Sequence, residues 1–221
     1  KWMKTEKRST MFPLNLMGGR SRIDYQPLGV VGVISPWNFP VNLTFGPLAG
    51  ILAAGNRAMI KPSEFTPATS ALMAEMVKEA WDEKEVAIFN GGPEVGQAFS
   101  GLAFDHLLFT GATGIARHIM AAASRNLVPV TLELGGKSPN LVLPDADLAA
   151  HLPAVAMGPL VNTGQSCISP TKVLVAKDRE AEVVGFYKAM YAGTAVGDPM
   201  AEGNHLGPLV NKAQYDKVKD L

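Results

Sequence analysis

The chain has 221 residues, with 20 lysines and arginines against 20 aspartates and glutamates, so its formal net charge is zero. This balance excludes a strongly basic nucleic-acid-binding protein and a protein with an acidic tail. Hydrophobic residues make up 47% and charged residues 18%, so the chain can fill a core and lacks the composition of a disordered protein. Its one cysteine excludes an internal disulfide and a multi-cysteine zinc site.

The sequence as it stands predicts neither a membrane span nor a secretory signal. No segment reaches the roughly 18 uninterrupted apolar residues of a membrane helix. The charged start, residues 1–8, leads into no apolar stretch. The four histidines are scattered, without the paired spacing of metal ligands. We therefore expect a cytoplasmic protein with no membrane segment, no metal and no nucleic-acid partner.

Short apolar strands alternate with helices over the first two-thirds of the chain. The pattern predicts strands at 30–34, 58–60, 86–89, 106–109 and 128–134, and helices at 41–54, 67–81, 94–100 and 113–124. Such alternation is typical of βαβ units and a parallel sheet, so the expected fold class is α/β. Ligands of such sheets bind beyond the carboxyl ends of the strands.

The pattern changes at both ends of this region. After Gly135–Gly136 we expect strands at 140–143 and 172–176 and helices at 147–161 and 178–191, which indicates a second α/β lobe. Near the start, the Gly18–Gly19 turn signal predicts a hairpin within residues 1–27.

Cys167 and Glu133 are the first candidates for chemistry. A lone cysteine is more often a buried, inert residue than a nucleophile, but small and polar residues precede Cys167. At a loop or helix start, the helix dipole can lower a thiol pKa. Glu133 ends an apolar strand; it is either a solvated charge or ion-pair partner of Lys137, or a general base whose pKa is raised by partial burial.

Three further segments have both a structural and a functional interpretation. Asn38 is either a turn residue between two prolines or a donor to an oxyanion. Lys61 and Glu64 follow a strand, where they could hold ribose hydroxyls; alternatively, Ser63 or Thr66 there caps the next helix. Residues 109–114 lie at a strand-to-helix junction that offers backbone amides to phosphate, although the G-x-G-x-x-G fingerprint is absent.

Each of these motifs is ambiguous alone, but five motifs in one order are specific enough to indicate a protein family. They are SPWNFP at 35–40, KPSE at 61–64, FTGATG at 109–114, LELGGKSP at 132–139 and GQSC at 164–167. From about residue 2 to residue 218, the chain resembles the NAD(P)-dependent aldehyde dehydrogenase superfamily. The segment YQPLGVVGVISPWNFP at 25–40 is most similar to the coniferyl-aldehyde dehydrogenase branch and its fatty-aldehyde relatives.

The resemblance implies a role for each motif. Cys167 matches the nucleophile, Glu133 the general base, and Asn38 the side-chain half of an oxyanion hole completed by the Cys167 backbone N–H. The positions that match contacts to NAD or NADP are Ile34, Ser35, Trp37, Lys61, Ser63, Glu64, Phe109, Gly111, Ala112, Leu134 and Gly135. The implied reaction oxidises an aldehyde to the carboxylic acid through a thiohemiacetal and a thioester on the cysteine.

Some positions depart from the family pattern. Ala112 replaces a serine that is common in the pyrophosphate turn, and Gly114 stands at a position that is often acidic, so the choice between NAD and NADP is open. Glu64 favours NAD because a carboxylate repels a 2′-phosphate. Gly46 stands where small-aldehyde members carry a bulky aromatic residue, which predicts a wider tunnel for aromatic or long-chain aldehydes.

The resemblance also implies a domain order and a missing remainder. Residues 1–27 match a linker and oligomerisation hairpin, 28–134 a partial Rossmann-like cofactor domain, and 135–221 the N-terminal part of a catalytic domain. Family members are roughly twice as long and form homodimers or homotetramers. We therefore expect a truncated or incomplete enzyme that is inactive alone. The alternative is a non-catalytic remnant that binds nucleotide or partners, against which the intact motifs argue.

Overall fold

The structure is a computed structural model that describes residues 3–220. The described part leaves out residues 1, 2 and 221. The first two belong to the predicted segment 1–27, and the last belongs to the predicted segment 135–221. The chain divides into two compact units, Lys1–Glu133 and Leu134–Leu221, which are described in turn.

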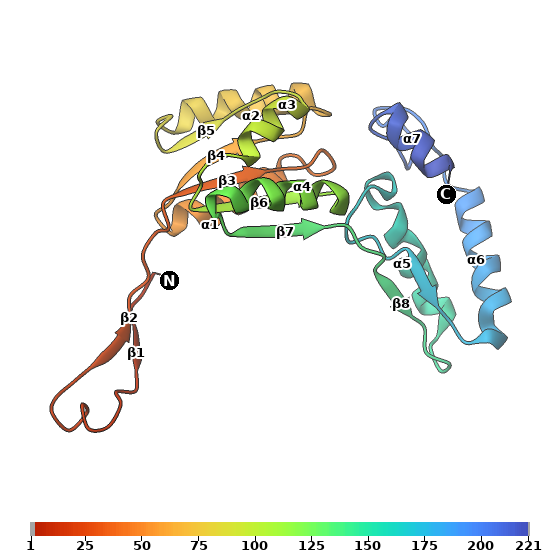
Figure 1. Cartoon of the computed structure of the whole chain (residues 1–221). Helices are drawn as coiled ribbons and strands as arrows, with labels where there is room; N and C mark the ends of the chain where they lie inside the picture. Colours follow the sequence, from red (N-terminus) through yellow and green to blue (C-terminus); the bar gives the residue numbers. More distant parts are fainter. Residues whose placement is uncertain (1–2, 221) are drawn as a thin grey trace. The chain divides into compact units, whose positions relative to one another are not determined.

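The first unit contains a hairpin and a five-stranded sheet (Figure 1). The hairpin strands β1 (Glu6–Arg8) and β2 (Ser21–Ile23) pair antiparallel. The sheet has the order β5-β4-β3-β6-β7. Its strands are β3 (Val30–Ile34), β4 (Arg57–Lys61), β5 (Val86–Ile88), β6 (His106–Gly111) and β7 (Val130–Leu134). Strand β3 is parallel to β4 and to β6, and β4 is parallel to β5, which confirms the predicted α/β class.

Four helices connect the sheet strands (Figure 1). They are α1 (Asn42–Ala53), α2 (Pro67–Ala80), α3 (Pro93–Ser100) and α4 (Thr113–Ala123), followed by a 3₁₀ turn, η1 (Ser124–Asn126). Prolines open α2 and α3, where a missing N–H costs nothing. Gly55 follows α1 with φ at 78°, a left-handed conformation that ends a helix and that glycine adopts without strain.

The sheet is covered on both faces. On one face, Val33, Ile60 and Val86 of the strands pack with Leu48 of α1 and Val77 of α2 in a buried cluster. Successive residues of a strand face opposite sides. Accordingly Gly32 faces the other layer, where an added Cβ would lie 2.7 Å from the Phe104 ring. The Phe104 ring packs on Phe99 of α3 with centroids 4.9 Å apart, and α3 contacts α4.

The second unit is a smaller α/β assembly. Strands β8 (Pro139–Leu141) and β9 (Lys172–Leu174) are parallel. The other elements are α5 (Leu148–Met157), the 3₁₀ segment η2 (Gly158–Gly164), η3 (Lys177–Arg179), α6 (Glu180–Ala192) and α7 (Lys212–Lys219). Leu148 and Leu152 of α5 pack with Val183 of α6 in a core of their own.

The second unit also shows where the sequence pattern misled. The helix expected to reach residue 161 ends at Met157, because the chain narrows to 3₁₀ turns and reaches a left-handed residue at Asn162. The sequence pattern does not predict helix α7. The Asn211 side chain caps it by accepting a hydrogen bond from the Gln214 N–H at 2.9 Å.

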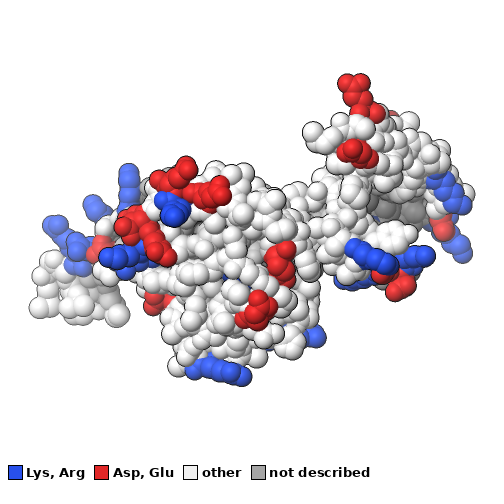
Figure 2. Space-filling model, turned by 90° about the horizontal axis from the view of Figure 1, so that it is seen from above, with Lys and Arg blue, Asp and Glu red and all other residues white. Residues whose placement is uncertain are grey.

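The surface agrees with the balanced charge. In the view of Figure 2, basic and acidic side chains are interspersed over a mostly uncharged surface. Among residues 3–220, no helix combines the length and the apolar character needed to cross a membrane.

The buried cluster yields a stability prediction. Ile60 is fully buried, so Ile60→Ala should lower the free energy of unfolding of the first unit by about 2–5 kcal/mol through lost burial and a cavity. The measurement is urea unfolding followed by tryptophan fluorescence, since all three tryptophans precede residue 134 and Trp81 packs against the cluster. Ile115→Ala is the matched control because Ile115 is 52% exposed on α4. Equal shifts for the two variants would contradict the assigned core.

Candidate functional site

Three neighbouring strands of the sheet end side by side. In the register of the parallel pairs, Ile34 of β3 lies opposite Lys61 of β4 and opposite Phe109 of β6. The chain leaves β3 toward β4 on one side and returns to β6 on the other, so the strand order reverses at β3. Such a switch point, at the carboxyl ends of parallel strands, is where open α/β sheets bind ligands. The fold therefore gathers three of the five sequence motifs at one edge.

The segment after β3 is locked in place by Ser35. Its hydroxyl lies 2.6 Å from Oγ1 of Thr44 on α1, and its backbone N–H donates to the carbonyl of Lys61 at 3.1 Å. Both hydroxyl-bearing residues are buried. Trp37 and Asn38 follow in a bend and are half-buried. Thr44 thus fixes the start of the segment that carries Asn38. Thr44 is not among the residues predicted from the sequence, where its only signal is a hydroxyl group within a largely apolar helix.

Lys61 and Glu64 form a partly buried ion pair beside this segment. Lys61 Nζ lies 2.7 Å from Glu64 Oε2, with side-chain exposures of 4% and 32%. Partial burial works to raise the pKa of Glu64, but the hydrogen bond from Lys61, a backbone hydrogen bond and the positive charge of Lys61 together outweigh it, and the pKa lies below its ordinary value. At Gly96 of α3, an added Cβ would lie 3.8 Å from Lys61 Cε, so this helix passes close to the lysine stem.

Ser63 is buried and belongs to a local turn. Its Oγ accepts a hydrogen bond from the Phe65 N–H at 3.2 Å, and its carbonyl accepts one from Ser70 Oγ at 3.0 Å. Neither Ser63 nor Thr66 caps α2 with its side chain, so the capping interpretation of this motif is wrong. The two hydrogen bonds instead hold the turn after β4 against the first turn of α2.

The end of β6 leads directly into α4. Phe109 is buried, Gly111 is half-buried and Ala112 is exposed at the N-cap of α4, where no side chain satisfies the first backbone amides. An added Cβ at Gly111 would lie 2.6 Å from the Phe109 ring, so the backbone passes close to that ring. Unsatisfied amides at a helix N-terminus favour an anion such as phosphate.

Glu133 lies near the end of β7, which is an edge strand of the sheet. Its side chain is exposed, as is that of Thr131 two residues earlier on the same face. The partial burial expected from the sequence is not found, because no element in the described part of the first unit covers Glu133 on its face of β7. Leu134 is half-buried and Gly135 is exposed, with no atom near an added Cβ.

Cys167 lies half-buried in a tight turn of the second unit. The Ser169 N–H donates to the Ser166 carbonyl at 3.2 Å and so closes the turn around the cysteine. Of the two positions expected, a loop or a helix start, the structure has the loop: η2 ends before the cysteine, at Gly164, and β9 is the next element.

The backbone just before Cys167 is strained. Asn162, Thr163 and Gly164 have φ angles of 53°, 57° and 74°, three left-handed residues in a row. Residues other than glycine avoid this region, and such strain gathers at functional sites. Only Gly164 adopts it freely, so the other two must be held by their surroundings.

The second unit also brings two of the motifs together. At Gly136, an added Cβ would lie 3.8 Å from the backbone carbonyl of Cys167. The Gly135–Gly136 segment thus passes beside the cysteine turn. Asn38 and Glu133 belong to the first unit and Cys167 to the second, so the structure forms two clusters of predicted site residues, one in each unit.

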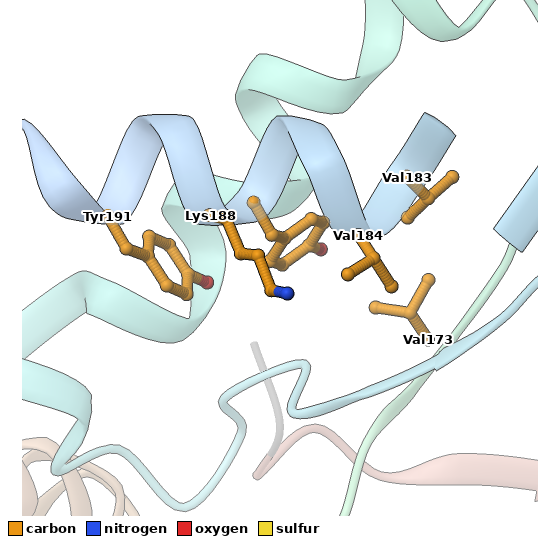
Figure 3. A pocket seen from close by; sticks show the side chains of 6 residues that line it. Val173, Val183, Val184, Lys188 and Tyr191 are labelled. Carbon is orange, nitrogen blue, oxygen red and sulfur yellow. The ribbon is translucent and has the colours of Figure 1, made fainter. Parts of the chain in front are cut away.

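A separate groove of about 500 Å³ runs along α6 (Figure 3). It is lined by Val173, Val183, Val184, Tyr187, Lys188 and Tyr191. Burial raises the pKa of Tyr187 and of Tyr191, and the Tyr191 hydroxyl donates to the Ala156 carbonyl at 3.0 Å. None of the predicted site residues lines this groove.

Within residues 3–220, no group of three or more His, Cys, Asp or Glu side chains is placed to hold a metal ion.

Comparison with known proteins supplies the family. A probable coniferyl aldehyde dehydrogenase of Caulobacter vibrioides is 56% identical over 221 residues, which is 99% of this chain and 45% of that protein. A coniferyl aldehyde dehydrogenase of a Pseudomonas species is 54% identical over 99% of this chain and 44% of its own length. The chain thus spans about half the length of these relatives.

Solved structures agree. The substrate-bound AldH of Staphylococcus aureus matches with a TM-score of 0.89 and 34% identity over 99% of this chain and 47% of that one. An aldehyde dehydrogenase of Mycobacterium tuberculosis complexed with NAD+ matches with a TM-score of 0.89 and 34% identity. That match covers 98% of this chain and 44% of the M. tuberculosis chain. The sequence model of the aldehyde dehydrogenase family matches residues 1–221. The chain belongs to the aldehyde dehydrogenase family.

Proposed function

We propose that this chain supplies the cofactor-binding sheet and the catalytic thiol of an enzyme that oxidises aldehydes with NAD. The observation that carries the proposal is the register of β4, β3 and β6, which aligns Lys61, Ile34 and Phe109 at one sheet edge. Relatives that are 56% and 54% identical bear coniferyl aldehyde dehydrogenase names, so an aromatic aldehyde of that kind is the proposed substrate.

The residues at this edge fit a dinucleotide. The Lys61–Glu64 pair offers a donor and an acceptor to ribose hydroxyls, and Gly111 and Ala112 expose the first amides of α4 to a phosphate. Ile34, Ser35, Trp37, Ser63, Leu134 and Gly135 complete the proposed cofactor contacts. A carboxylate at Glu64 favours NAD over NADP, in keeping with the NAD+ in the solved M. tuberculosis relative. NAD+, when bound, accepts hydride from the substrate carbon.

Cys167 is the proposed nucleophile. Its thiolate adds to the aldehyde carbon and forms a thiohemiacetal. The resulting oxyanion receives hydrogen bonds from the Asn38 side chain and from the Cys167 backbone N–H. Loss of hydride from the tetrahedral carbon then leaves a thioester on Cys167.

Glu133 is the proposed general base for the second half of the reaction. It takes a proton from water, the water attacks the thioester carbonyl, and the carboxylic acid leaves as the Cys167 thiolate is regenerated. A relative that passes its acyl group to another thiol has no need of this base, so the presence of Glu133 supports hydrolysis.

Two further parts of the proposal concern size and assembly. At Gly46 on α1, an added Cβ would meet only Asn42 Oδ1, at 3.9 Å, so the helix leaves space for a bulky substrate. The hairpin loop between β1 and β2 exposes Met11, Phe12, Leu16 and Met17. We assign that apolar loop to contact with a second copy in a homodimer or homotetramer. Since the chain spans about half of its relatives, the 221 residues alone should not turn over substrate.

The catalytic roles can be tested by grafting. The 221 residues replace the matched segment of the C. vibrioides relative, and reduction of NAD+ by coniferyl aldehyde is followed by absorbance. Cys167→Ala should abolish the reaction. Glu133→Gln should keep a rapid burst of about one reduced cofactor per site, because hydride transfer precedes hydrolysis. Its steady-state turnover after the burst should be about 10²–10⁴-fold slower than that of the unmutated graft.

The controls for the graft are the isolated chain and an exposed carboxylate. Glu79→Gln on α2 lies outside the proposed site and should keep the parent rate. Steady turnover by the isolated 221 residues would overturn the proposed inactivity. A Cys167→Ala graft with parent activity would remove the nucleophile from the mechanism.

The Gly46 space leads to a specificity prediction. In the same graft, Gly46→Phe should lower kcat/KM for coniferyl aldehyde by about tenfold or more while sparing acetaldehyde, because the ring fills space that only the larger substrate uses. The measurement is the ratio of the two kcat/KM values. Gly50→Phe, on the same helix and with no atom near an added Cβ, is the control. A parallel loss for both aldehydes would argue against a substrate path at Gly46.

The Lys61–Glu64 pair yields a pH prediction. Because the pKa of Glu64 is lowered by Lys61, its contribution to stability is full above the ordinary glutamate pKa and is lost as the pH falls through the lowered value. The difference in free energy of unfolding between the wild type and Glu64→Gln should therefore be present at neutral pH and vanish in acid. Urea titrations across that range measure it, with Glu79→Gln as control. A pH-independent difference would exclude the ion pair as its source.

A further inference from the structure

We infer that Gln165 is a positioning residue, which fixes the turn that carries Cys167 by tying it to the C-terminal segment of the chain. The inference rests on the proposed role of Cys167 and adds the device that holds this thiol in place. All of the contacts involved lie within the second unit.

Gln165 uses both ends of its side-chain amide. Its Oε1 accepts a hydrogen bond from the Val210 backbone N–H at 2.9 Å, and its Nε2 donates to the Asn162 carbonyl at 3.1 Å. Val210 lies 45 residues further along the chain. One planar amide thus joins the start of the cysteine turn to a remote backbone segment, and a bridge of this kind needs a donor and an acceptor on one side chain.

The strained backbone explains why such a bridge is needed. The left-handed run at Asn162, Thr163 and Gly164 immediately precedes Gln165, and the Asn162 carbonyl also accepts the Gln165 N–H at 3.1 Å. Two hydrogen bonds from Gln165 therefore converge on the first residue of the run. Strained conformations persist only where the surroundings over-determine them.

The other side of the turn has an anchor that does not involve Gln165. The Asn140 Nδ2 donates to the Pro170 carbonyl at 3.3 Å. An added Cβ at Gly158 would lie 2.7 Å from Pro170 Cγ, so the proline is packed tightly against that backbone. Cys167 lies between the two anchors. Gln165 therefore fixes the backbone that leads from η2 into the cysteine turn.

The C-terminal segment provides a firm attachment point. Val196 and Leu206 form a parallel bridge, and the Gly197 N–H donates to the Leu206 carbonyl at 2.9 Å. Val210 follows, directly before Asn211, which caps α7. The position of Cys167 is thereby coupled to a part of the chain that contributes no catalytic side chain of its own.

The tether is tested by the alkylation of Cys167, the single cysteine of the chain. The rate with iodoacetamide is measured against pH, and the plateau rates, where the thiol is fully ionised, are compared. Gln165→Met removes both side-chain hydrogen bonds at similar size, so its plateau rate should rise about fivefold, the scale of one lost hydrogen bond. Gln165→Glu retains the acceptor for the Val210 N–H but loses the donor to the Asn162 carbonyl, so its plateau rate should lie between those of the wild type and Gln165→Met.

Amide hydrogen exchange at Val210 gives the second readout. Exchange should be about fivefold faster in Gln165→Met, which leaves the Val210 N–H without its acceptor, and unchanged in Gln165→Glu. If Gln165→Met does not fold, faster Val210 exchange in a folded Gln165→Glu would still overturn the tether. Wild-type alkylation and exchange in a folded Gln165→Met would overturn it as well.

Two controls separate positioning from loss of stability. Val183→Ala weakens the core of the same unit without touching the turn, so it should lower Tm and leave the plateau alkylation rate unchanged. Gln97→Met repeats the substitution at an exposed site on α3. Equal acceleration in Val183→Ala would overturn the inference. Neither readout requires aldehyde turnover, so an inactive graft would defeat the proposed function and leave the tether standing.

Discussion

The parallel register of β3 with both of its neighbours is the constraint on which the proposed cofactor site depends. It places Ile34, Lys61 and Phe109 abreast, although Lys61 and Phe109 belong to two different motifs and Ile34 directly precedes a third. The interior of the first unit enforces the register, because a slip by one residue would turn Val33 and Ile60 out of their buried cluster. The apolar cluster thus also sets the positions of the polar groups that follow the strands, above all the Lys61–Glu64 pair. These polar groups are not themselves part of the cluster.

The cysteine turn is held by a different kind of force. The second unit has its own small apolar core, but the segment around Cys167 is defined by hydrogen bonds: Ser169 to Ser166, Asn140 to Pro170, and Gln165 to two backbone groups. Directional bonds set positions more sharply than apolar contacts do, which suits a thiol that must meet a carbon atom. They also offset the left-handed backbone just before the cysteine.

The sequence predicted most of the sheet because its signals are local. Strand β3 is a short β-branched run and appears at the expected residues, 30–34. Helix α7 could not be anticipated, since its eight residues are largely charged or polar and lack an apolar face of helical period. The exposure of Glu133 depends on what packs over its face of β7, and the bond from Val210 to Gln165 spans 45 residues. Both are properties of the assembled fold.

The long reach of the central strand also bears on the order of folding. Gly29, just before β3, bonds to Asn56 across 27 residues, whereas Val30 bonds to Asp105 across 75. Closing the longer loop costs more chain entropy, so β3 and β4 gain their partners before β6 can join them. During synthesis from the N-terminus, the β4 side of the sheet can form while β6 is still being made. Pairing of β6 with β3 then follows pairing of β4 with β3, and β7 adds to β6 after that.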